Sequence, residues 1–522
     1  MHLSHTDHSV SPPRVEIPRE YNAAHDLLAR NAARADKVAF IDAATGIQIT
    51  YGELTDQAHR FANALRAQGF APESRVMIAM HDSLEWPVVF LGCILAGVVP
   101  VAANTMLNTR DFEFMLRDSR AQALFVSKAL LPAFDPLFGT LPSLKTVIVG
   151  GGGSHNSVAS FIKSGADALH VTSTCADDPC FWLYSSGSTG TPKGTVHLHS
   201  HLIQTAELYA RPVLGIREDD LVFSAAKLFF AYGLGNSLTF PMSVGATTVL
   251  LASRPTPADV YGVLKKYKPS IFYGVPTLFA ALLASADKPA RSELNLRVSA
   301  SAGEALPAEI GRRWSDTFGT DILDGIGSTE MLHIFLSNRP GEVRYGTTGK
   351  AVPGYELRIL NDEGRECADG EIGELQIRGP SSAIMYWNSR ARTKATFVGE
   401  WTRSGDKYTR DADGYYTYGG RSDDMLKVGG IYVSPFEVEA CLMTHDAVLE
   451  AAVIGAADTD ELIKPKAYVV LKAGQQASAE DLQSHVKSRL APYKYPRWIV
   501  FATELPKTAT GKIQRFKLRN SA

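Results

Sequence analysis

The stretch Tyr184-Ser-Ser-Gly-Ser-Thr-Gly-Thr-Pro-Lys-Gly194 combines glycines, hydroxyl side chains and a lysine directly after a short apolar run. Glycine lets the backbone turn so that successive N–H groups converge on an anion, and hydroxyl groups add further donors. The stretch therefore predicts a loop that cradles a polyphosphate. Its expected contact residues are Ser185, Ser186, Gly187, Ser188, Thr189 and Gly190, with the positive charge of Lys193 beside them.

Two other interpretations of this loop are weaker. A P-loop of the GxxxxGK[ST] type needs glycine directly before the lysine, and Pro192 stands there. A flexible Ser/Gly-rich surface linker is the other alternative, but a linker needs neither a preceding buried strand nor this lysine. We therefore expect a phosphate-binding loop.

The sequence around the loop predicts an α/β fold. Between Tyr21 and Leu251, helical patterns alternate with short apolar runs, which indicates layered α/β structure with a largely parallel sheet. Residues 347–380 change to short strands with turns and predict a small antiparallel or β-barrel-like unit. A compact α+β pattern follows a further break near 419–430. We expect a flexible polar tail over 1–20, a large N-terminal domain over 21–420 and a small C-terminal domain over 421–522.

Composition excludes several classes of protein. The chain has 522 residues, with 53 basic and 55 acidic side chains, so no overall charge favours nucleic acid or an anionic membrane. Five cysteines without a CxxC pair argue against a disulfide framework and fit a reducing cytoplasm. The uncharged stretch 86–109 is interrupted by proline and glycine, so we expect a buried helix and strand there and no membrane span.

The phosphate loop resembles the signature of the adenylate-forming superfamily, which includes acyl-CoA ligases, peptide-synthetase adenylation domains and luciferases. Further motifs occur in that family's order. They are SAGEA at 301–305, DGIGSTE at 324–330, WTRSGD at 401–406, GRSDDMLK at 420–427 and PKTATGK at 506–512. The segments 224–241, 324–338 and 491–501 resemble the benzoate–CoA ligase group in particular.

The resemblance implies a ligase that uses ATP, Mg²⁺ and coenzyme A. A carboxylate is a poor acyl donor, so attack on the α-phosphate of ATP first makes an acyl-adenylate, and the enzyme must screen carboxylate–phosphate repulsion with donors, cations and a metal. Glu330 is the candidate for Mg²⁺, and Thr329 is a donor to the α-phosphate. Without the motif, Glu330 would be taken for an acid at a helix N-terminus.

The nucleotide contacts come from several motifs. Asp406 can accept both ribose hydroxyls, and Arg421 can reach ribose or phosphate, although isolated charges of this kind often form surface ion pairs. Many family members have an aromatic residue where Ile326 stands, so adenine stacking should be weaker here or come from elsewhere. The residues implied to border adenine are Ala302, Gly303, Glu304, Asp324, Gly325 and Ile326.

The C-terminal domain is implied to rotate between the two half-reactions. Lys512 is the expected catalytic lysine of adenylation, with a solvated basic tail as the alternative, and its acetylation by a regulatory acetyltransferase would remove the charge. Asp423 matches the hinge position. Gly429 and Gly430 are implied to let the pantetheine of coenzyme A pass close to the backbone.

The acid pocket is expected to hold a flat aromatic acid. Small residues leave room for a ring that aromatic and aliphatic side chains line, although each of these residues could instead be core. We expect benzoate; a substituted benzoate such as hydroxybenzoate, loading of a carrier protein, and a non-catalytic nucleotide sensor are the alternatives, and a homodimer stays open. The expected pocket residues are Phe230, Ala231, Tyr232, Gly233, Gly327, His333 and Ile334.

Three alternating histidines follow the loop directly. On a strand, His197, His199 and His201 would share one face and could suggest a metal site. Neither a carboxylate nor a cysteine with matching spacing accompanies them, and the run follows the phosphate loop directly, so we do not expect a metal site here.

Overall fold

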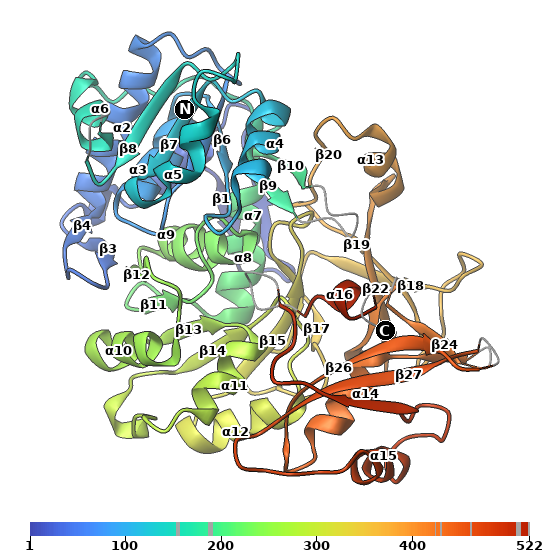
Figure 1. Cartoon of the computed structure of the whole chain (residues 1–522). Coiled ribbons are helices and arrows are strands. Elements are labelled where there is room, and N and C mark those ends of the chain that lie inside the picture. The colour runs from blue at the N-terminus through green and yellow to red at the C-terminus, as the bar shows by residue number, and fades with distance from the viewer. Residues whose placement is uncertain are drawn as a thin grey trace.

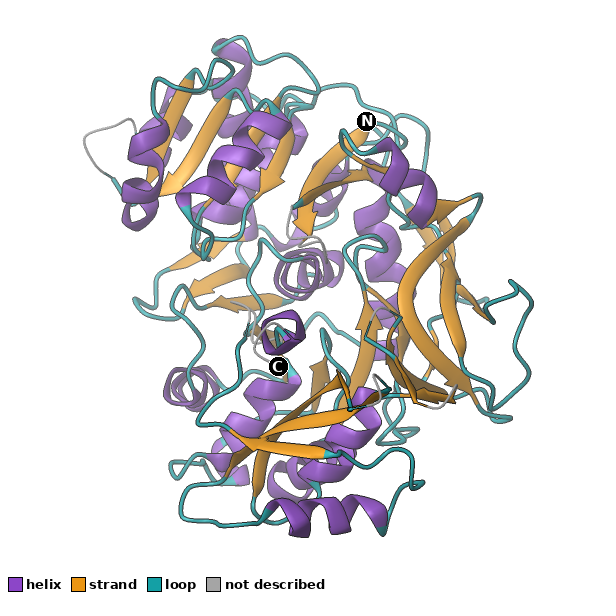
Figure 2. Cartoon of the chain, turned by 45° about the vertical axis from the view of Figure 1, so that its right-hand side comes forward, coloured by secondary structure: helices purple, strands orange, loops and turns teal. Residues whose placement is uncertain are grey.

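The structure is a computed structural model of the chain (Figure 1). It describes residues 1–152, 157–185, 192–422, 424–428, 431–459, 462–507 and 513–519. Two large sheets with helices packed against them, a smaller antiparallel sheet and a C-terminal α+β domain make up the molecule, as the sequence predicts (Figures 1 and 2).

The first large sheet carries the phosphate loop between two of its strands. Its order is β20-β10-β9-β6-β5-β7-β8, and β9, β6, β5, β7 and β8 run parallel to their neighbours. Strand β10 pairs antiparallel with β9, and β20 pairs antiparallel with β10. The strands are β5 (Arg75–Ala79), β6 (Val99–Ala102), β7 (Ala123–Ser127), β8 (Thr146–Gly150), β9 (Pro179–Ser185), β10 (Lys193–Leu198) and β20 (Met385–Tyr386).

The helices beside this sheet follow from local sequence signals. Thr50 caps α2 by accepting from the Glu53 N–H, and the Glu53 carboxylate accepts from the Thr50 N–H in return. Helix α3 is apolar along its length and buried, and β6 follows it, which confirms the predicted helix and strand over 86–109. No helix of the described residues is long and apolar enough to cross a membrane. The helices are α2 (Tyr51–Ala67), α3 (Glu85–Leu95), α4 (Thr109–Ser119), α5 (Leu131–Phe134) and α6 (Val158–Ser164), with short 3₁₀ turns η2 (Lys128–Leu130) and η3 (Asp135–Leu137).

The second large sheet has the order β17-β16-β15-β14-β13-β11-β12-β3-β4. Its middle strands from β15 to β3 are parallel, so their carboxyl ends share one edge. The strands are β3 (Val38–Asp42), β4 (Gln48–Thr50), β11 (Leu221–Ser224), β12 (Thr247–Leu250), β13 (Ile271–Gly274), β14 (Val298–Ser301), β15 (Ile322–Gly327), β16 (Ile334–Ser337) and β17 (Lys350–Ala351).

Two π-helical turns interrupt the helices of this region. They are η4 (Ala206–Leu214) and η5 (Gly235–Thr239), and π-turns of this kind are frequent near functional sites. The other helices of the region are α1 (Ala23–Ala29), η1 (Ala32–Arg34), α7 (His199–Thr205), α8 (Ala231–Leu234), α9 (Phe240–Val244), α10 (Pro257–Tyr267), α11 (Pro276–Ala284), η6 (Arg291–Glu293) and α12 (Ala308–Phe318).

The predicted small unit is an antiparallel sheet that continues to Arg421. Its order is β18-β19-β22-β21, and β23 pairs with β22. Of the two predicted forms, antiparallel sheet and β-barrel-like unit, the structure has the antiparallel sheet. Its elements are β18 (Glu356–Leu360), β19 (Gly373–Arg378), α13 (Arg390–Thr396), β21 (Phe397–Val398), β22 (Trp401–Arg410) and β23 (Tyr416–Arg421).

The C-terminal elements have hydrophobic cores of their own. One forms around Val438, Leu442 and Val469, and a second around Ile454 and Leu518. These elements lie below the antiparallel sheet in Figure 1. They are β24 (Leu426–Val428), β25 (Ile431–Val433), α14 (Pro435–Met443), β26 (Val448–Ala457), β27 (Ile463–Leu471), α15 (Ala479–Lys487), β28 (Trp498–Phe501) and α16 (Arg515–Arg519).

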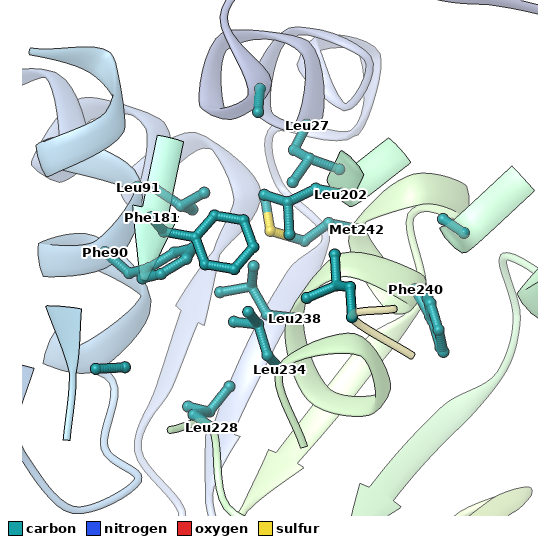
Figure 3. Close-up of a cluster of buried hydrophobic side chains, with 14 of the residues drawn as sticks. Leu27, Phe90, Leu91, Phe181, Leu202, Leu228, Leu234, Leu238, Phe240 and Met242 are labelled. Atoms are coloured by element: carbon teal, nitrogen blue, oxygen red, sulfur yellow. The ribbon is translucent and has the colours of Figure 1, made fainter. Parts of the chain in front are cut away.

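A single buried cluster joins the three sheets of the N-terminal region. Its members come from β5, β7 and β9 of the first sheet, from β3, β11 and β13 to β16 of the second, and from β18, β19, β22 and β23 of the third. Figure 3 shows the part of this cluster where α1, α3, β9 and α7 meet the segment 228–242. Strand β9, which precedes the predicted phosphate loop, and the segment 228–242 therefore share one core. The labelled residues are Leu27, Phe90, Leu91, Phe181, Leu202, Leu228, Leu234, Leu238, Phe240 and Met242.

The expected flexible tail over 1–20 is instead a docked hairpin. Strands β1 (His5–Asp7) and β2 (Arg14–Glu16) pair antiparallel. The Ser4 hydroxyl donates to Asp26 Oδ2 at 2.6 Å, and His8 Nε2 lies 2.8 Å from Oε2 of the buried Glu207. The prediction was wrong because buried carboxylates far along the chain give these polar residues partners, which composition alone does not show.

Candidate active site

Two of the predicted nucleotide segments meet at the carboxyl edge of the second sheet. Strands β14 and β15 are parallel neighbours, with Ser301 opposite Asp324. The segments 302–304 and 324–326 therefore lie side by side, at the kind of edge where open α/β sheets bind their ligands. Gly303 has φ 97°, a conformation that glycine adopts without strain. The structure thus brings together the residues expected to border adenine.

Asp324 is a buried carboxyl group at this edge. Burial raises its pKa well above the ordinary value, although backbone hydrogen bonds from Leu306 and Gly325 partly oppose the shift. Its Oδ1 has no hydrogen-bond partner among the described residues. A neutral carboxyl group with an open position can exchange a hydrogen bond with a polar ligand.

The Thr329–Glu330 turn connects β15 to β16 and is tied down from two sides. The N–H of Ala383 donates to the Glu330 carbonyl at 2.7 Å, and His197 Nε2 donates to the Thr329 carbonyl at 2.8 Å. Because a neutral imidazole carries one proton, His197 then accepts at Nδ1, where His201 Nδ1 lies 3.0 Å away. The turn therefore depends on the strand that follows the phosphate loop.

The three histidines do not lie on one strand, so the expectation that they share one face of a strand is wrong. Strand β10 ends at Leu198, which leaves His199 and His201 on α7. His199 Nδ1 accepts from the Ala23 N–H at 3.1 Å, away from the pair formed by the other two rings. Burial lowers the pKa of His197 and of His199 to about 4, so both rings are neutral at pH 7. These contacts give the three histidines structural partners within the protein.

Lys193, Glu330 and Tyr386 form one compact group. Lys193 Nζ lies 3.8 Å from Glu330 Oε1 and donates to the Tyr386 hydroxyl at 3.3 Å. The Tyr386 hydroxyl donates to the same Glu330 Oε1 at 2.5 Å. Burial lowers the pKa of Lys193, and the Glu330 charge opposes that shift. Sequence reasoning missed Tyr386; its signal is a pair of aromatic residues beside an asparagine in the segment 385–388.

The segment after Tyr386 fixes the strands that carry the phosphate loop. The Trp387 N–H donates to the Gly194 carbonyl at 2.7 Å, and the Trp387 indole donates to the Asp118 carbonyl at 2.9 Å. The Asp118 carboxylate in turn accepts from the Tyr184 hydroxyl at 2.7 Å. Ser185 is the last residue of β9, and Lys193 is the first of β10. The predicted loop residues Ser186, Gly187, Ser188, Thr189 and Gly190 lie outside the described residues.

Asp406 and Arg421 face each other in the third sheet. They are register partners in the β22–β23 pair, and Arg421 Nη1 lies 3.2 Å from Asp406 Oδ1. The same guanidinium donates to the Ser404 carbonyl at 3.1 Å. Asp406 is 8% exposed, so this pair is partly shielded from water and is no ordinary surface ion pair.

The residues predicted for the acid pocket lie on α8, at the end of β15 and around the start of β16. The Tyr232 hydroxyl donates to the Ala300 carbonyl at 3.1 Å, and Phe230 caps α8 at its N-terminus. Gly327 pairs with Ile334, and a Cβ at Gly327 would lie 2.6 Å from the His333 backbone. Ala231 and Gly233 lie within α8. The structure therefore brings the seven predicted residues together.

His333 lies at the centre of an aromatic cage. Its ring centroid is 4.4 Å from that of Phe240, 5.4 Å from Tyr209 and 5.5 Å from Tyr232. Nε2 lies 3.2 Å from Asn236 Oδ1, while Nδ1 has no partner among the described residues. Burial lowers the pKa of His333 to about 3, so the ring is neutral and presents one open nitrogen.

A buried pair upstream of α8 was missed by sequence reasoning. Asp82 Oδ1 accepts from the Leu228 N–H at 3.1 Å, and Lys227 Nζ donates to the Ser253 carbonyl at 2.8 Å. Burial raises the pKa of Asp82 to about 6. These contacts hold residues 227 and 228, which lead into α8. Neither Asp82 nor Lys227 lies in a sequence motif by which it could have been recognised.

The remaining predicted site residues lie outside the described part of the chain. They are the catalytic candidate Lys512, the hinge candidate Asp423, and the coenzyme A candidates Gly429 and Gly430. Their immediate neighbours are described: Arg515 Nη2 pairs with Glu439 Oε2 at 2.7 Å, and its Nη1 lies 3.7 Å from Asp424 Oδ2.

Glu330 fits a magnesium ion that is shared with a nucleotide. The described residues contain no group of three or more His, Cys, Asp or Glu side chains that could hold a metal by themselves. Mg²⁺ at such sites is bound by one or two carboxylates together with phosphate oxygens and water. The single carboxylate of Glu330, 3.8 Å from Lys193, meets that requirement.

The chain is similar to known proteins along its whole length. The family described as AMP-binding enzyme matches residues 28–387, and the AMP-binding enzyme C-terminal domain matches 437–512. A benzoate–CoA ligase of Thauera aromatica is 59% identical, with 99% of each chain covered. A 4-hydroxybenzoate–CoA/benzoate–CoA ligase of Rhodopseudomonas palustris is 49% identical, with 96% of this chain and 94% of that one covered.

Solved structures agree with the sequence matches. A benzoate CoA ligase from Burkholderia xenovorans LB400 superposes with a TM-score of 0.90 at 55% identity, covering 96% of this chain and 100% of that one. The anthranilate CoA ligase AuaEII, in complex with anthranoyl-AMP, gives 0.93 at 44% identity, with 97% and 98% covered. The motifs, the fold and these matches agree: the chain belongs to the AMP-binding enzyme family, the adenylate-forming superfamily that its sequence resembles.

Proposed function

We propose that this protein is a benzoate–CoA ligase, which makes benzoyl-AMP and pyrophosphate from benzoate and ATP and then benzoyl-CoA and AMP. The observation that carries the proposal is the full-length likeness to benzoate–CoA ligases. The aromatic residues Phe230 and Tyr232 of the predicted acid pocket support it, because a flat ring packs well against aromatic side chains.

In the first step, a benzoate oxygen attacks the α-phosphorus, and the bond from that phosphorus to the bridging oxygen breaks to release pyrophosphate. Lys193 and the donors of the phosphate loop hold the β- and γ-phosphates, and Thr329 donates to the α-phosphate. Lys512 places its ammonium between the carboxylate and the α-phosphate, which lowers their repulsion. Glu330 would hold Mg²⁺, which neutralises phosphate charge when bound.

Two groups of residues orient the nucleotide: the Asp406–Arg421 pair of the third sheet and the carboxyl edge of the second sheet. Asp406 accepts from the ribose hydroxyls, and Arg421 keeps that carboxylate in place. Adenine lies between the segments 302–304 and 324–326, with Ile326 supplying an aliphatic contact where an aromatic ring would stack.

In the second step, the thiol of coenzyme A loses its proton and attacks the acyl carbon, and AMP leaves. We propose that Asp423 is the hinge by which the C-terminal domain, residues 421–522, turns to this state. Gly429 and Gly430 then leave room for the pantetheine arm. The separate hydrophobic cores of that domain support movement as a unit.

The proposal extends to regulation and location. Acetylation of Lys512 would remove its charge and stop the first step. Five free cysteines fit a reducing cytoplasm. Light scattering on the purified chain measures whether it is the homodimer that the sequence left open.

A substrate panel tests the proposal. Benzoate, hydroxybenzoates, aminobenzoates, halobenzoates and short alkanoates are compared by ATP- and CoA-dependent thioester formation. Benzoate should have the highest kcat/KM, and 4-hydroxybenzoate is the second candidate because one relative is named for both acids. Preference for an alkanoate would contradict the pocket assignment, and absence of acid-dependent pyrophosphate release would favour a nucleotide sensor.

A further inference from the structure

The hydroxyl group of Tyr386 stands between two opposite charges. It donates to Glu330 Oε1 at 2.5 Å and accepts from Lys193 Nζ at 3.3 Å, whereas Lys193 Nζ and Glu330 Oε1 are 3.8 Å apart. A phenol has one proton and two lone pairs, so it satisfies both contacts at once. The lysine and the glutamate are therefore joined through the hydroxyl, and their direct separation is longer than a hydrogen bond.

The position of Tyr386 is fixed by its neighbours on both sides. Strand β20 pairs with β10, and the Thr393 hydroxyl accepts from the Tyr386 N–H at 3.0 Å. The ring centroid lies 5.3 Å from that of Phe397, with the two rings tilted by 51°, and Lys193 Nζ lies 4.3 Å from the Tyr386 ring centroid. Backbone pairing and the contact with Phe397 thus hold the Tyr386 ring in place without either charge, and Lys193 adds a further contact.

We infer that Tyr386 is a positioning residue that holds the Lys193–Glu330 ion pair open at 3.8 Å and keeps it from closing to a direct hydrogen bond, so that the ammonium stays available to phosphate and the carboxylate to a divalent cation. The inference rests on the proposed function of the two charged residues. Both side chains are mostly buried, at 19% and 16% exposure, where a direct pair would be poorly screened by water. A closed pair would have to open before it could bind Mg-ATP.

Tyr386→Phe tests the hydroxyl alone, because phenylalanine keeps the ring and its contact with Lys193. Binding of Mg-ATP, measured by calorimetry on the full chain without acid or coenzyme A, should weaken about tenfold, the loss typical of one hydrogen bond to a charged group. Tyr261→Phe is the matched control, since the buried hydroxyl of Tyr261 in α10 donates to the Leu282 carbonyl of α11 at 2.7 Å and contacts neither charge. It should leave Mg-ATP binding unchanged.

A double-mutant cycle separates positioning from general structural damage. In the Glu330→Gln background, Lys193 cannot close onto a carboxylate, so adding Tyr386→Phe should weaken Mg-ATP binding by less than about twofold. Equal losses in both backgrounds would overturn the inference, and so would unchanged binding in the single variant. Thermal unfolding of each variant, compared with that of Tyr261→Phe, shows whether the fold is kept.

This test stands apart from that of the proposed function. If the unmodified chain binds Mg-ATP but releases no pyrophosphate with benzoate, the ligase assignment fails while the cycle still decides the role of Tyr386. If the chain is a ligase and the cycle shows no coupling between Tyr386 and Glu330, only the positioning role fails.

Discussion

His197 Nε2 lies 2.8 Å from the carbonyl oxygen of Thr329, across 132 positions of sequence. This contact joins β10, which follows the phosphate loop, to the turn that carries Glu330. The imidazole of His197 therefore helps to position the turn that carries the metal candidate.

Removal of that imidazole should impair adenylation. His197→Ala leaves the Thr329 carbonyl without its donor, so kcat/KM for benzoate-dependent pyrophosphate release should fall about tenfold or more. His197→Gln, whose amide can donate to the same carbonyl, should retain more activity. Equal activity of the Ala and Gln variants would show that the donated hydrogen bond is not what matters.

Lys512→Ala should separate the two half-reactions. Loss of one group that stabilises charge in a transition state commonly costs about a hundredfold or more, so pyrophosphate release should fall by that amount. Thioester formation from supplied benzoyl-AMP should change little. Lys507→Ala is the control. Lys507 lies in the same segment as Lys512, but its ammonium pairs with the Glu450 carboxylate at 2.6 Å. A matching loss in both half-reactions would argue against the assigned role.

Asp406→Asn should weaken ATP binding more than catalysis. The amide is a poorer partner for Arg421 and for ribose, so KM for ATP should rise about tenfold with a smaller change in kcat. Asp411→Asn removes an exposed carboxylate that pairs with Arg344 at 2.8 Å and should leave both parameters unchanged. Steady-state kinetics at varied ATP measures this, and the same KM in both variants would exclude a ribose contact.

A methyl group beside His333 should disturb the acid site selectively. A Cβ at Gly235 would lie 2.4 Å from His333 Cδ2 and 2.9 Å from Phe240, so Gly235→Ala must move the cage. We expect KM for benzoate to rise about tenfold while KM for ATP stays within about twofold, as expected for an overpacked site. Gly262→Ala, in α10 with open space around its Cβ, is the control. A similar rise in both KM values would mean a general disturbance.

Buried histidines should make the protein sensitive to mild acid. The folded-state pKa of His199, about 4, lies below the unfolded value of about 6.5, so its contribution to stability is present above pH 6.5 and is lost as pH falls toward 4. His199→Asn, whose amide oxygen can still accept from Ala23, should reduce the loss near pH 5 by about 1 kcal/mol per pH unit. The thermal midpoints of the unmodified chain and of His199→Asn at pH 7, 6 and 5 measure this difference. The same fall of the midpoint with pH in both proteins would contradict the prediction.

Sequence reasoning located those parts of the site that local geometry determines. Residues 302–304 and 324–326 could be placed together because consecutive parallel strands end at one edge. Tyr386 could not be found in this way, since its partner Lys193 is 193 positions away and only the pairing of β20 with β10 brings them together. The alternation of His197, His199 and His201 was misleading because α7 begins at His199, so the spacing of a strand did not apply. Lys512 and Asp423 remain predictions.

The independent cores of the C-terminal elements bear on how the protein loses its structure when heated. Because one cluster unites the three N-terminal sheets, those sheets should melt as a single cooperative unit, while the cluster around Val438 and Leu442 can open without them. A partly melted chain would then keep its nucleotide edge and lose the module that carries Lys512. Such a form would still sequester ATP but consume none, which makes residual nucleotide binding a poor measure of active enzyme in an aged preparation.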